Sequence, residues 1–433
     1  MSDRYGTPGR RVAVVDGVRT PFVRAGTAFK RLSAIELGKL AVAELLSRSA
    51  IDPAAVDLLV FGTVVPNVLA PNIAREVALH PRFPKTLDAF SVSRACASAN
   101  QAITDAADQI VLGHRTIAVA GGAESLSNVP ILHSRGFSDA LVAASRAKST
   151  MQRVKTLAQL RPKDLIPVTP AIAEPTTGET MGQSADTMAK LNGITREAQD
   201  QFALRSHRMA AAGWKDGRLA AEVAPVYVGP EFSTAVTADN GIREDSSLEQ
   251  MAALKPVFDR QYGTVTAANA SPLTDGGAAV LLMREDVAAA LGYQPMAYIR
   301  SYAYAALDPA EQLLQAPAIA APIAMQRAGV SLADLDLVEM HEAFAAQVLS
   351  NLHGLASPAW AARAGMSAPL GEVDRAKLNV MGGSIAIGHP FGATGARVLT
   401  TLCRELQRRN GQFGLMTVCA AGGLGHAMVV ERA

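Results

Sequence analysis

The sequence predicts an α/β protein made of two similar halves. Short apolar runs alternate with longer helical patterns, one such unit occurs twice, and a proline-rich segment interrupts the first copy. The chain has 433 residues, which at about 100–200 residues per domain is enough for two or three packed units. Hydrophobic residues make up 49% of the chain and charged residues 18%, so a folded chain with a sizeable core is expected.

The alternation of helix and strand is clear in the first 120 residues. Residues 33–48 and 97–112 carry apolar side chains at helical spacing, whereas residues 57–65 and 116–120 are apolar runs bounded by turn residues. Strands that alternate with helices are typical of the α/β class.

The repeated unit pairs residues 51–62 with residues 330–341. Each copy follows a helical pattern and ends in a strand of the buried type. We therefore predict an N-terminal half over residues 1–290 and a C-terminal half over residues 291–433.

A second parallel supports the duplication. The helix expected after Cys96 leads to the strand at 116–120, and the helix expected after Gly392 leads to a strand at 413–419. A pair of glycines follows each strand. Two α/β halves that pack against each other are the simplest interpretation.

Residues 128–258 break the pattern and are predicted to form an inserted loop domain. The segment contains some helix, notably at 195–214, and insertions of this length usually serve a function. Its proline residues are Pro130, Pro162, Pro167, Pro170, Pro175, Pro225, Pro230 and Pro256.

Within the insertion, residues 135–163 form a local basic stretch. It is either a solvated helix face, or a contact for a phosphate-rich ligand, a partner subunit or an anionic surface. Its cations are Arg135, Arg146, Lys148, Arg153, Lys155, Arg161 and Lys163, against only Asp139 within the stretch and Asp164 beside it.

The overall charge excludes several classes of partner. Lys plus Arg number 41 against 39 Asp plus Glu, so no global field argues for nucleic acid or an anionic membrane.

The apolar stretch at 313–325 is too short to span a bilayer and contains Pro317 and Pro322, so no transmembrane segment is predicted. No secretory signal is recognisable, and a cytoplasmic protein is expected.

The three cysteines, Cys96, Cys403 and Cys419, contain no C-x-x-C pair and predict neither a disulfide framework nor a zinc ribbon. Cys96 lies where a strand-like run gives way to a helix, a position at which backbone N–H groups and the helix dipole stabilise a thiolate. Cys419 ends a strand before a glycine turn. Cys403 lies in the middle of a helix and is interpreted as core packing, an explanation that the surroundings of Cys96 also allow.

Two histidines have comparable positions. His389 lies in a glycine-rich loop that is neither a dinucleotide fingerprint nor a phosphate loop, but that lets a substrate approach closely. His341 lies at a strand-to-helix junction. Because ligands bind at the carboxyl ends of strands in α/β sheets, we expect both imidazoles to converge with Cys96 and Cys419. A Cys/His metal cluster is the competing interpretation, but it lacks any short ligand spacing, and no metal is predicted.

In combination, these segments resemble the thiolase family, and the resemblance runs from about residue 11 to residue 431. The chain is most similar to the 3-ketoacyl-CoA thiolases that form the thiolase subunit of fatty-acid oxidation complexes. The motifs are Arg94-Ala-Cys-Ala-Ser-Ala-Asn-Gln-Ala102, Gly263-Thr-Val-Thr-Ala-Ala-Asn-Ala-Ser271, His341-Glu-Ala-Phe344, Gly388-His-Pro390 and Cys419-Ala-Ala-Gly-Gly423.

The resemblance implies a duplicated five-layer αβαβα fold and a thiolytic reaction in fatty-acid β-oxidation. Cys96 would attack the C3 carbonyl of a 3-ketoacyl-CoA after passing its proton to His389, and would retain the shortened acyl group as a thioester. Cys419 would protonate the departing acetyl-CoA enolate. One oxyanion hole would use His389 with a water or side chain at the position of His341, and the other the backbone N–H groups of Cys96 and Ala421.

The chain departs from the usual family pattern at two positions. His341 stands where most thiolases have Asn, and Ala421 stands where many have Gly. Coenzyme A contacts carry over to Met181 and Ser271 along the pantetheine and to Arg243 near the adenine. Coenzyme A is a substrate here, and no separate cofactor is implied.

The resemblance also implies a homodimer or tetramer, and a possible hydratase/dehydrogenase α-subunit as partner. Rival functions are a short-chain acetyl-CoA acetyltransferase, a biosynthetic acetoacetyl-CoA synthase, and a thiolase for branched or steroid side chains. A non-catalytic acyl-CoA- or lipid-binding protein, and a decarboxylating ketosynthase with a Cys-His-His site, are rivals of other kinds.

Overall fold

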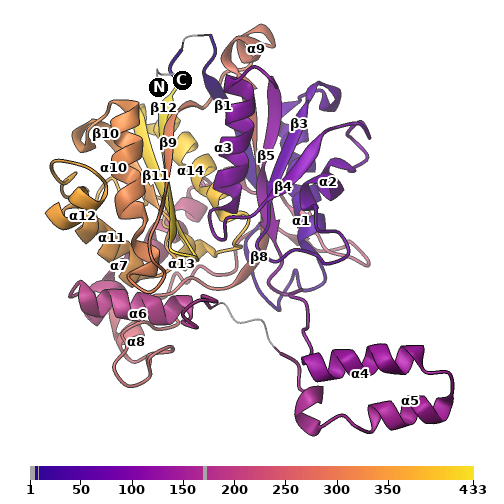
Figure 1. Cartoon of the computed structure of the whole chain (residues 1–433). Coiled ribbons are helices and arrows are strands. Elements are labelled where there is room, and N and C mark those ends of the chain that lie inside the picture. Colours follow the sequence, from indigo (N-terminus) through magenta and orange to yellow (C-terminus); the bar gives the residue numbers. More distant parts are fainter. Residues whose placement is uncertain (1–4, 8, 169–172) are drawn as a thin grey trace.

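A computed structural model describes residues 5–7, 9–168 and 173–433. Ten strands form one mixed sheet in the order β10-β11-β12-β9-β1-β8-β5-β3-β4, with β2 paired to β8 (Figure 1). The strands are β1 (Val12–Arg19), β2 (Val23–Arg24), β3 (Leu58–Gly62), β4 (Ala89–Val92), β5 (Ile117–Glu124), β8 (Thr274–Arg284), β9 (Ala297–Ala306), β10 (Leu335–Met340), β11 (Phe413–Ala420) and β12 (Leu424–Arg432).

The sheet consists of two half-sheets joined at a short seam. Strand β1 pairs with β8 along its whole length, but with β9 only over the three residues Val12, Ala13 and Val14. Helices cover the faces of both half-sheets (Figure 1). They are α1 (Ala34–Ser49), α2 (Ile73–Ala78), α3 (Ser98–Val111), α9 (Glu285–Ala290), α10 (Pro317–Ala328), α11 (Ala345–Leu355), α12 (Pro358–Arg363), α13 (Ser384–Ile387) and α14 (Thr394–Arg409).

Three apolar clusters show that the elements stack in five layers. The central cluster joins α3 and α14 to the inner faces of both half-sheets, through side chains such as Ile103 and Leu399. A second cluster packs α1 against the outer face of the N-terminal half-sheet, and a third packs α10 and α11 against the outer face of the C-terminal one. The predicted five-layer α/β fold is confirmed.

The two halves repeat the same local structure, as predicted. Ala50 (φ 51°) directly follows α1, and Gly329 (φ 71°) directly follows α10; both residues have the left-handed conformation that stops a helix. A single turn of 3₁₀ helix follows each and leads into β3 or β10. In each half two neighbouring strands, β3 with β5 and β10 with β11, are parallel, and the strand that follows them toward the centre of the sheet, β8 or β12, is antiparallel. The exact boundary between the halves stays a prediction.

Local sequence signals explain where the helices begin. Ser33 and Glu36 form a capping box at α1, in which each side chain accepts from the other residue's backbone N–H. At α7 (Arg196–Lys215), the Thr195 hydroxyl accepts from the Ala198 backbone N–H at 3.1 Å. The helix predicted at 195–214 is therefore present.

The chain between β5 and β8 holds the remaining elements. These are α4 (Arg135–Arg146), α5 (Thr150–Leu157), α6 (Met181–Leu191), α7, β6 (Val226–Tyr227), β7 (Ala235–Val236) and α8 (Leu248–Ala252). Helices α6 to α8 lie against the body, whereas the α4–α5 hairpin extends away from it (Figure 1). The hairpin carries the basic stretch, and Ala144 is the one buried residue of its two helices. Among the described residues, no helix is long and apolar enough to cross a membrane.

Candidate active site

Cys96 lies at the tip of a tight turn between β4 and α3. The preceding residue, Ala95, has a φ of 44°, a conformation that L-residues rarely adopt. The Ser98 hydroxyl holds this turn, because it accepts from the Arg94 backbone N–H at 2.9 Å and donates to the Ala95 carbonyl at 2.6 Å. Cys96 is therefore half-buried, just before the first turn of α3.

Two backbone N–H groups face the thiol of Cys96, its own and that of Ala421. These hydrogen bonds lower the pKa of Cys96, but loss of solvation is the larger effect and raises it above its usual value. The sequence predicts that the helix start stabilises a thiolate at Cys96. In the structure, burial outweighs this effect, so Cys96 is not a thiolate at rest. Cys96 is a thiol at neutral pH and needs a base to become a nucleophile.

Cys419, near the end of β11, is the second thiol of the site. It is buried in an apolar cluster with Met181 and Phe344. Burial raises its pKa well above the usual range, and the charge that Cys96 would carry raises it further. The two thiols are thus close enough to influence each other.

His389 lies in the loop between α13 and α14. Its position depends on Gly388, which has a φ of 117° and leaves no room for a side chain: a Cβ there would lie 2.6 Å from Cγ2 of Thr274. Burial lowers the pKa of His389 to about 3, so the ring is neutral at pH 7. It can then act as a proton acceptor.

Hydrogen bonds determine which ring nitrogen of His389 is the acceptor. The Thr394 hydroxyl donates its single proton to the Pro390 carbonyl at 3.0 Å, and it lies 2.7 Å from Nδ1 of His389. Nδ1 must therefore donate to Thr394, which leaves the lone pair on Nε2. Nε2 is buried without a partner among the described residues, as expected of a base that awaits a substrate proton.

His341 follows β10 directly and lies against His389. The centroids of the two rings are 4.1 Å apart. Burial lowers the pKa of His341 well below its usual value, and the nearby His389 and Arg397 lower it further. Both imidazoles are therefore neutral.

Close packing connects the segment that follows His389 to the start of α3, the helix that follows Cys96. A Cβ on Gly395 would lie 2.1 Å from Oδ1 of Asn100, which is in the first turn of α3. The buried carboxylate of Glu124 accepts from the Gly392 backbone N–H at 3.0 Å and acts electrostatically on Cys96. The structure thus places the two thiols beside each other and the two imidazoles beside each other, and the contacts of Gly395 and Glu124 join the two pairs.

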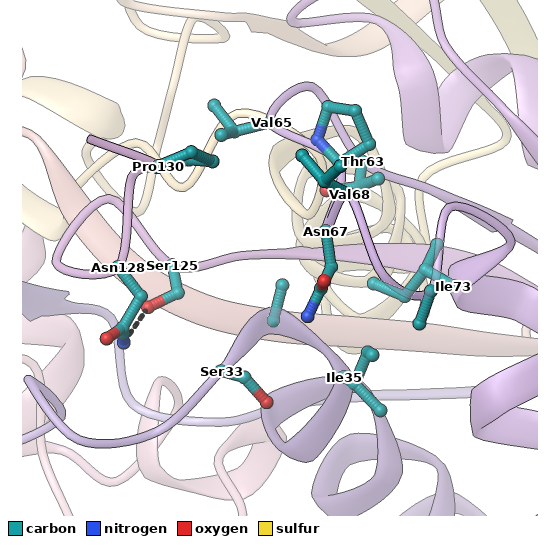
Figure 2. Close-up of a pocket in the computed structure, with 13 residues that line it drawn as sticks. Ser33, Ile35, Thr63, Val65, Asn67, Val68, Ile73, Ser125, Asn128 and Pro130 are labelled. Atoms are coloured by element: carbon teal, nitrogen blue, oxygen red, sulfur yellow. Dashed lines mark hydrogen bonds between the residues drawn. The ribbon is translucent and has the colours of Figure 1, made fainter. Parts of the chain in front are cut away.

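A cavity of about 240 Å³ lies at the carboxyl ends of β3 and β5 (Figure 2). Its wall includes Thr63 and Val65, which both donate to the Glu124 carboxylate at 3.0 Å. In Figure 2, the side chains of Ile35 and Ile73 also border it. None of the predicted site residues lines this cavity, but Glu124 connects its wall to the His389 loop.

Two of the three candidate contacts for coenzyme A, Met181 and Ser271, lie next to residues of the site, and Arg243 lies among other basic groups. Met181, at the start of α6, packs in one cluster with Cys419. The Ser271 backbone N–H donates to the Ala343 carbonyl at 2.9 Å, two residues from His341. Arg243 is exposed, and its backbone N–H donates to Nδ1 of His207. Burial lowers the pKa of Arg24, and the charge of Arg243 lowers it further. This concentration of basic groups is suited to an anion.

Four functional candidates escaped the sequence analysis, namely Thr394, Ser384, Arg397 and Glu124. Ser384 and Thr394 belong to the glycine-rich run that was interpreted only as a tight loop holding His389, and Arg397 lies in the helix that follows this run. A polar or charged residue among apolar neighbours of a buried helix, such as Arg397 in α14, is the signal that could have found them. In the described part of the chain, no group of three or more His, Cys, Asp or Glu side chains could hold a metal ion.

A duplicated five-layer fold, in which one thiol comes from the N-terminal half and one thiol and two imidazoles come from the C-terminal half, defines the class of the thiolases. Family models agree, since the N-terminal thiolase domain matches residues 12–286 and the C-terminal thiolase domain matches residues 293–432. The chain belongs to the thiolase family.

Individual relatives refine this assignment. A 3-ketoacyl-CoA thiolase of Pectobacterium carotovorum is 54% identical, and one of Yersinia enterocolitica is 52% identical, each over 98% of this chain and 97% of the relative. A solved structure of human mitochondrial 3-ketoacyl-CoA thiolase has a TM-score of 0.83 at 30% identity, over 99% of this chain and 100% of that one. The acetyl-CoA acetyltransferase of Bacillus anthracis has a TM-score of 0.83 at 32% identity, over 98% of both chains.

Proposed function

We propose that the protein cleaves 3-ketoacyl-CoA with coenzyme A, giving acetyl-CoA and an acyl-CoA shortened by two carbons, in fatty-acid β-oxidation. The observation that carries the proposal is the pairing of Cys96 with two backbone N–H groups beside a second buried thiol, Cys419. A binding protein has no need for two thiols and a neutral imidazole base in one place.

In the first half of the reaction, Nε2 of His389 takes the proton of Cys96, and the sulfur adds to C3 of the substrate. The oxyanion that forms accepts from the N–H groups of Cys96 and Ala421, which already face the sulfur. The C2–C3 bond then breaks, the acyl group stays on Cys96 and the electron pair moves into the enolate of acetyl-CoA. Cys419 protonates C2, and acetyl-CoA leaves.

In the second half, the thiol of coenzyme A gives its proton to the thiolate of Cys419 and attacks the thioester. The bond to Cys96 breaks, and the protonated His389 returns its proton to the Cys96 sulfur. Both thiols and the imidazole are then as they were at the start. The raised pKa of Cys419 suits this role, because a weak acid leaves a strong base for the thiol of coenzyme A.

For coenzyme A itself, we propose that Met181 and Ser271 contact the pantetheine and that Arg243 lies near the adenine end. Arg243 is connected to the centre through Gly241, where a Cβ would lie 2.7 Å from the Ala386 carbonyl of α13. Arg243→Ala should therefore raise KM for coenzyme A and leave kcat nearly unchanged.

The direct test compares cleavage of acetoacetyl-CoA with cleavage of a long-chain 3-ketoacyl-CoA, with Cys96→Ala as the blank. Preference for the long chain supports the degradative function, as do the names of the relatives. Preference for acetoacetyl-CoA would favour a short-chain acetyltransferase, the activity named for the Bacillus anthracis neighbour. Cleavage of neither would refute a catalytic function.

For partners, we propose a homodimer or tetramer that binds a hydratase/dehydrogenase α-subunit through the α4–α5 hairpin. The hairpin extends from the body (Figure 1). Its cations Arg153 and Lys155 are exposed. Reversing both charges should abolish co-sedimentation with that partner and leave the affinity for coenzyme A intact. The matched control reverses the exposed pair Lys30 and Arg31. If the hairpin variant binds like the control, the docking proposal is wrong. We propose the cytoplasm as its compartment, which fractionation of the native host tests.

A further inference from the structure

A chain of buried polar side chains leads from α14 to His341. Nη2 of Arg397 lies 2.9 Å from Oγ of Ser384, and the same Oγ lies 3.0 Å from Nδ1 of His341. All three side chains are at most 1% exposed. In such a chain, the donor at one end fixes the direction of each following hydrogen bond, and so determines which nitrogen at the other end carries a proton.

The direction of each hydrogen bond follows from the donors and acceptors. A guanidinium has only donors, so Oγ of Ser384 accepts from Arg397. Among the described residues, no other acceptor contacts this hydroxyl, so its single proton points to Nδ1 of His341, which accepts it. A neutral His341 therefore carries its proton on Nε2.

The two neighbouring imidazoles thus have opposite tautomers. His389 has its proton on Nδ1, where Thr394 accepts it, and has a free lone pair on Nε2. His341 has its lone pair engaged by Ser384 and has an N–H on Nε2. Both Nε2 atoms are buried without a partner among the described residues. One ring is prepared to accept a proton, and the other to donate a hydrogen bond.

We propose that Arg397 and Ser384 are positioning residues that hold His341 as a neutral Nε2–H donor for the oxygen of the enolate. The proposal rests on the proposed function and explains how a histidine can serve where most thiolases have Asn. Without Arg397, the Ser384 hydroxyl could rotate and accept from Nδ1–H instead, and Nε2 would then repel the developing negative charge.

The surroundings of Arg397 also keep His341 neutral. The cation of Arg397 faces His341 from α14, and His389 faces it from the neighbouring loop; both oppose a second proton on the ring. Burial lowers the pKa of Arg397, and the acidic side chains of Glu339, Glu222 and Glu342 beside it act in the opposite direction. His341 can then donate a hydrogen bond without becoming a competing acid.

The test reads the tautomer directly, by ¹⁵N NMR of the full-length protein labelled at histidine and without substrate. The wild-type spectrum should show a protonated Nε2 and an unprotonated Nδ1 for His341. Ser384→Ala removes the hydroxyl that donates to Nδ1 of His341. The kcat should then fall by about 10- to 100-fold with KM nearly unchanged, which is the size of effect expected when one oxyanion donor is weakened.

Variants at Arg397 keep the test informative if Ser384→Ala folds poorly. Arg397→Met removes the donor and should disturb the tautomer, whereas Arg397→Lys keeps a donor-only cation and should restore much of kcat. Ser301→Ala is the matched control, because it also removes a buried serine hydroxyl. Ser301 lies in β9, and its hydroxyl donates to the Ala324 carbonyl of α10 at 2.6 Å. This control should leave tautomer and kcat as in the wild type.

A proton on Nδ1 of His341 in the wild type would overturn the proposal, as would variants at Ser384 and Arg397 that match the Ser301→Ala control. The NMR measurement needs no turnover. A wild-type protein with the expected tautomer but no thiolase activity would therefore support the hydrogen-bond chain and refute the proposed function instead.

Discussion

The role of Thr394 gives the sharpest prediction about the base. In Thr394→Val the isosteric side chain keeps the packing but cannot accept from Nδ1 of His389, which is 3% exposed. A buried N–H without a partner costs about 1–3 kcal/mol, so the ring favours the other tautomer by roughly 5- to 150-fold relative to the wild type. The proton then blocks Nε2, and kcat for cleavage of 3-ketoacyl-CoA should fall, by up to the same factor.

The assay is CoA-dependent cleavage at saturating substrate, with thermal unfolding measured in parallel. Thr394→Ser keeps the hydroxyl and should retain most of kcat, which separates the hydrogen bond from the shape of the side chain. A Thr394→Val protein that folds normally and still turns over at more than half the wild-type rate would refute the claim that Thr394 keeps Nε2 of His389 free to act as the base.

Three further predictions concern the neighbouring groups. Cys419→Ala should fail to exchange the α-protons of acetyl-CoA with solvent deuterium; exchange at the wild-type rate would remove Cys419 from the proposed proton transfer. Because burial lowers the pKa of His389 to about 3, this ring stays neutral above that pH, and kcat/KM should show no acid limb between pH 5 and 7; a limb near pH 6.5 would contradict this. Gly388→Ala should cost roughly 1–3 kcal/mol of unfolding free energy from its φ of 117° alone, and should lower kcat by displacing His389; denaturant unfolding identical to the wild type would refute the strain.

Much of the architecture could be predicted because it is written in local patterns. The helix at 195–214 follows from periodicity and a threonine cap, and the duplication follows from two segments that share spacing and turn residues. The positions of Cys96, His341, His389 and Cys419 at the ends of strands or starts of helices were also predictable, because such junctions are local features.

The sequence by itself determined the fold class, the repeated halves and the four residues that could carry chemistry. Tertiary structure alone decided their chemical state. Cys96 is a thiol and not a thiolate because burial outweighs the hydrogen bonds from Ala421 and its own backbone. The sequence does not distinguish the protonation of the two histidines. His389 has a lone pair on Nε2 because Thr394 accepts from its Nδ1, whereas His341 has a proton on Nε2 because Ser384 donates to its Nδ1. Solvation and hydrogen-bond direction depend on neighbours brought together by folding, and no spacing along the chain encodes them.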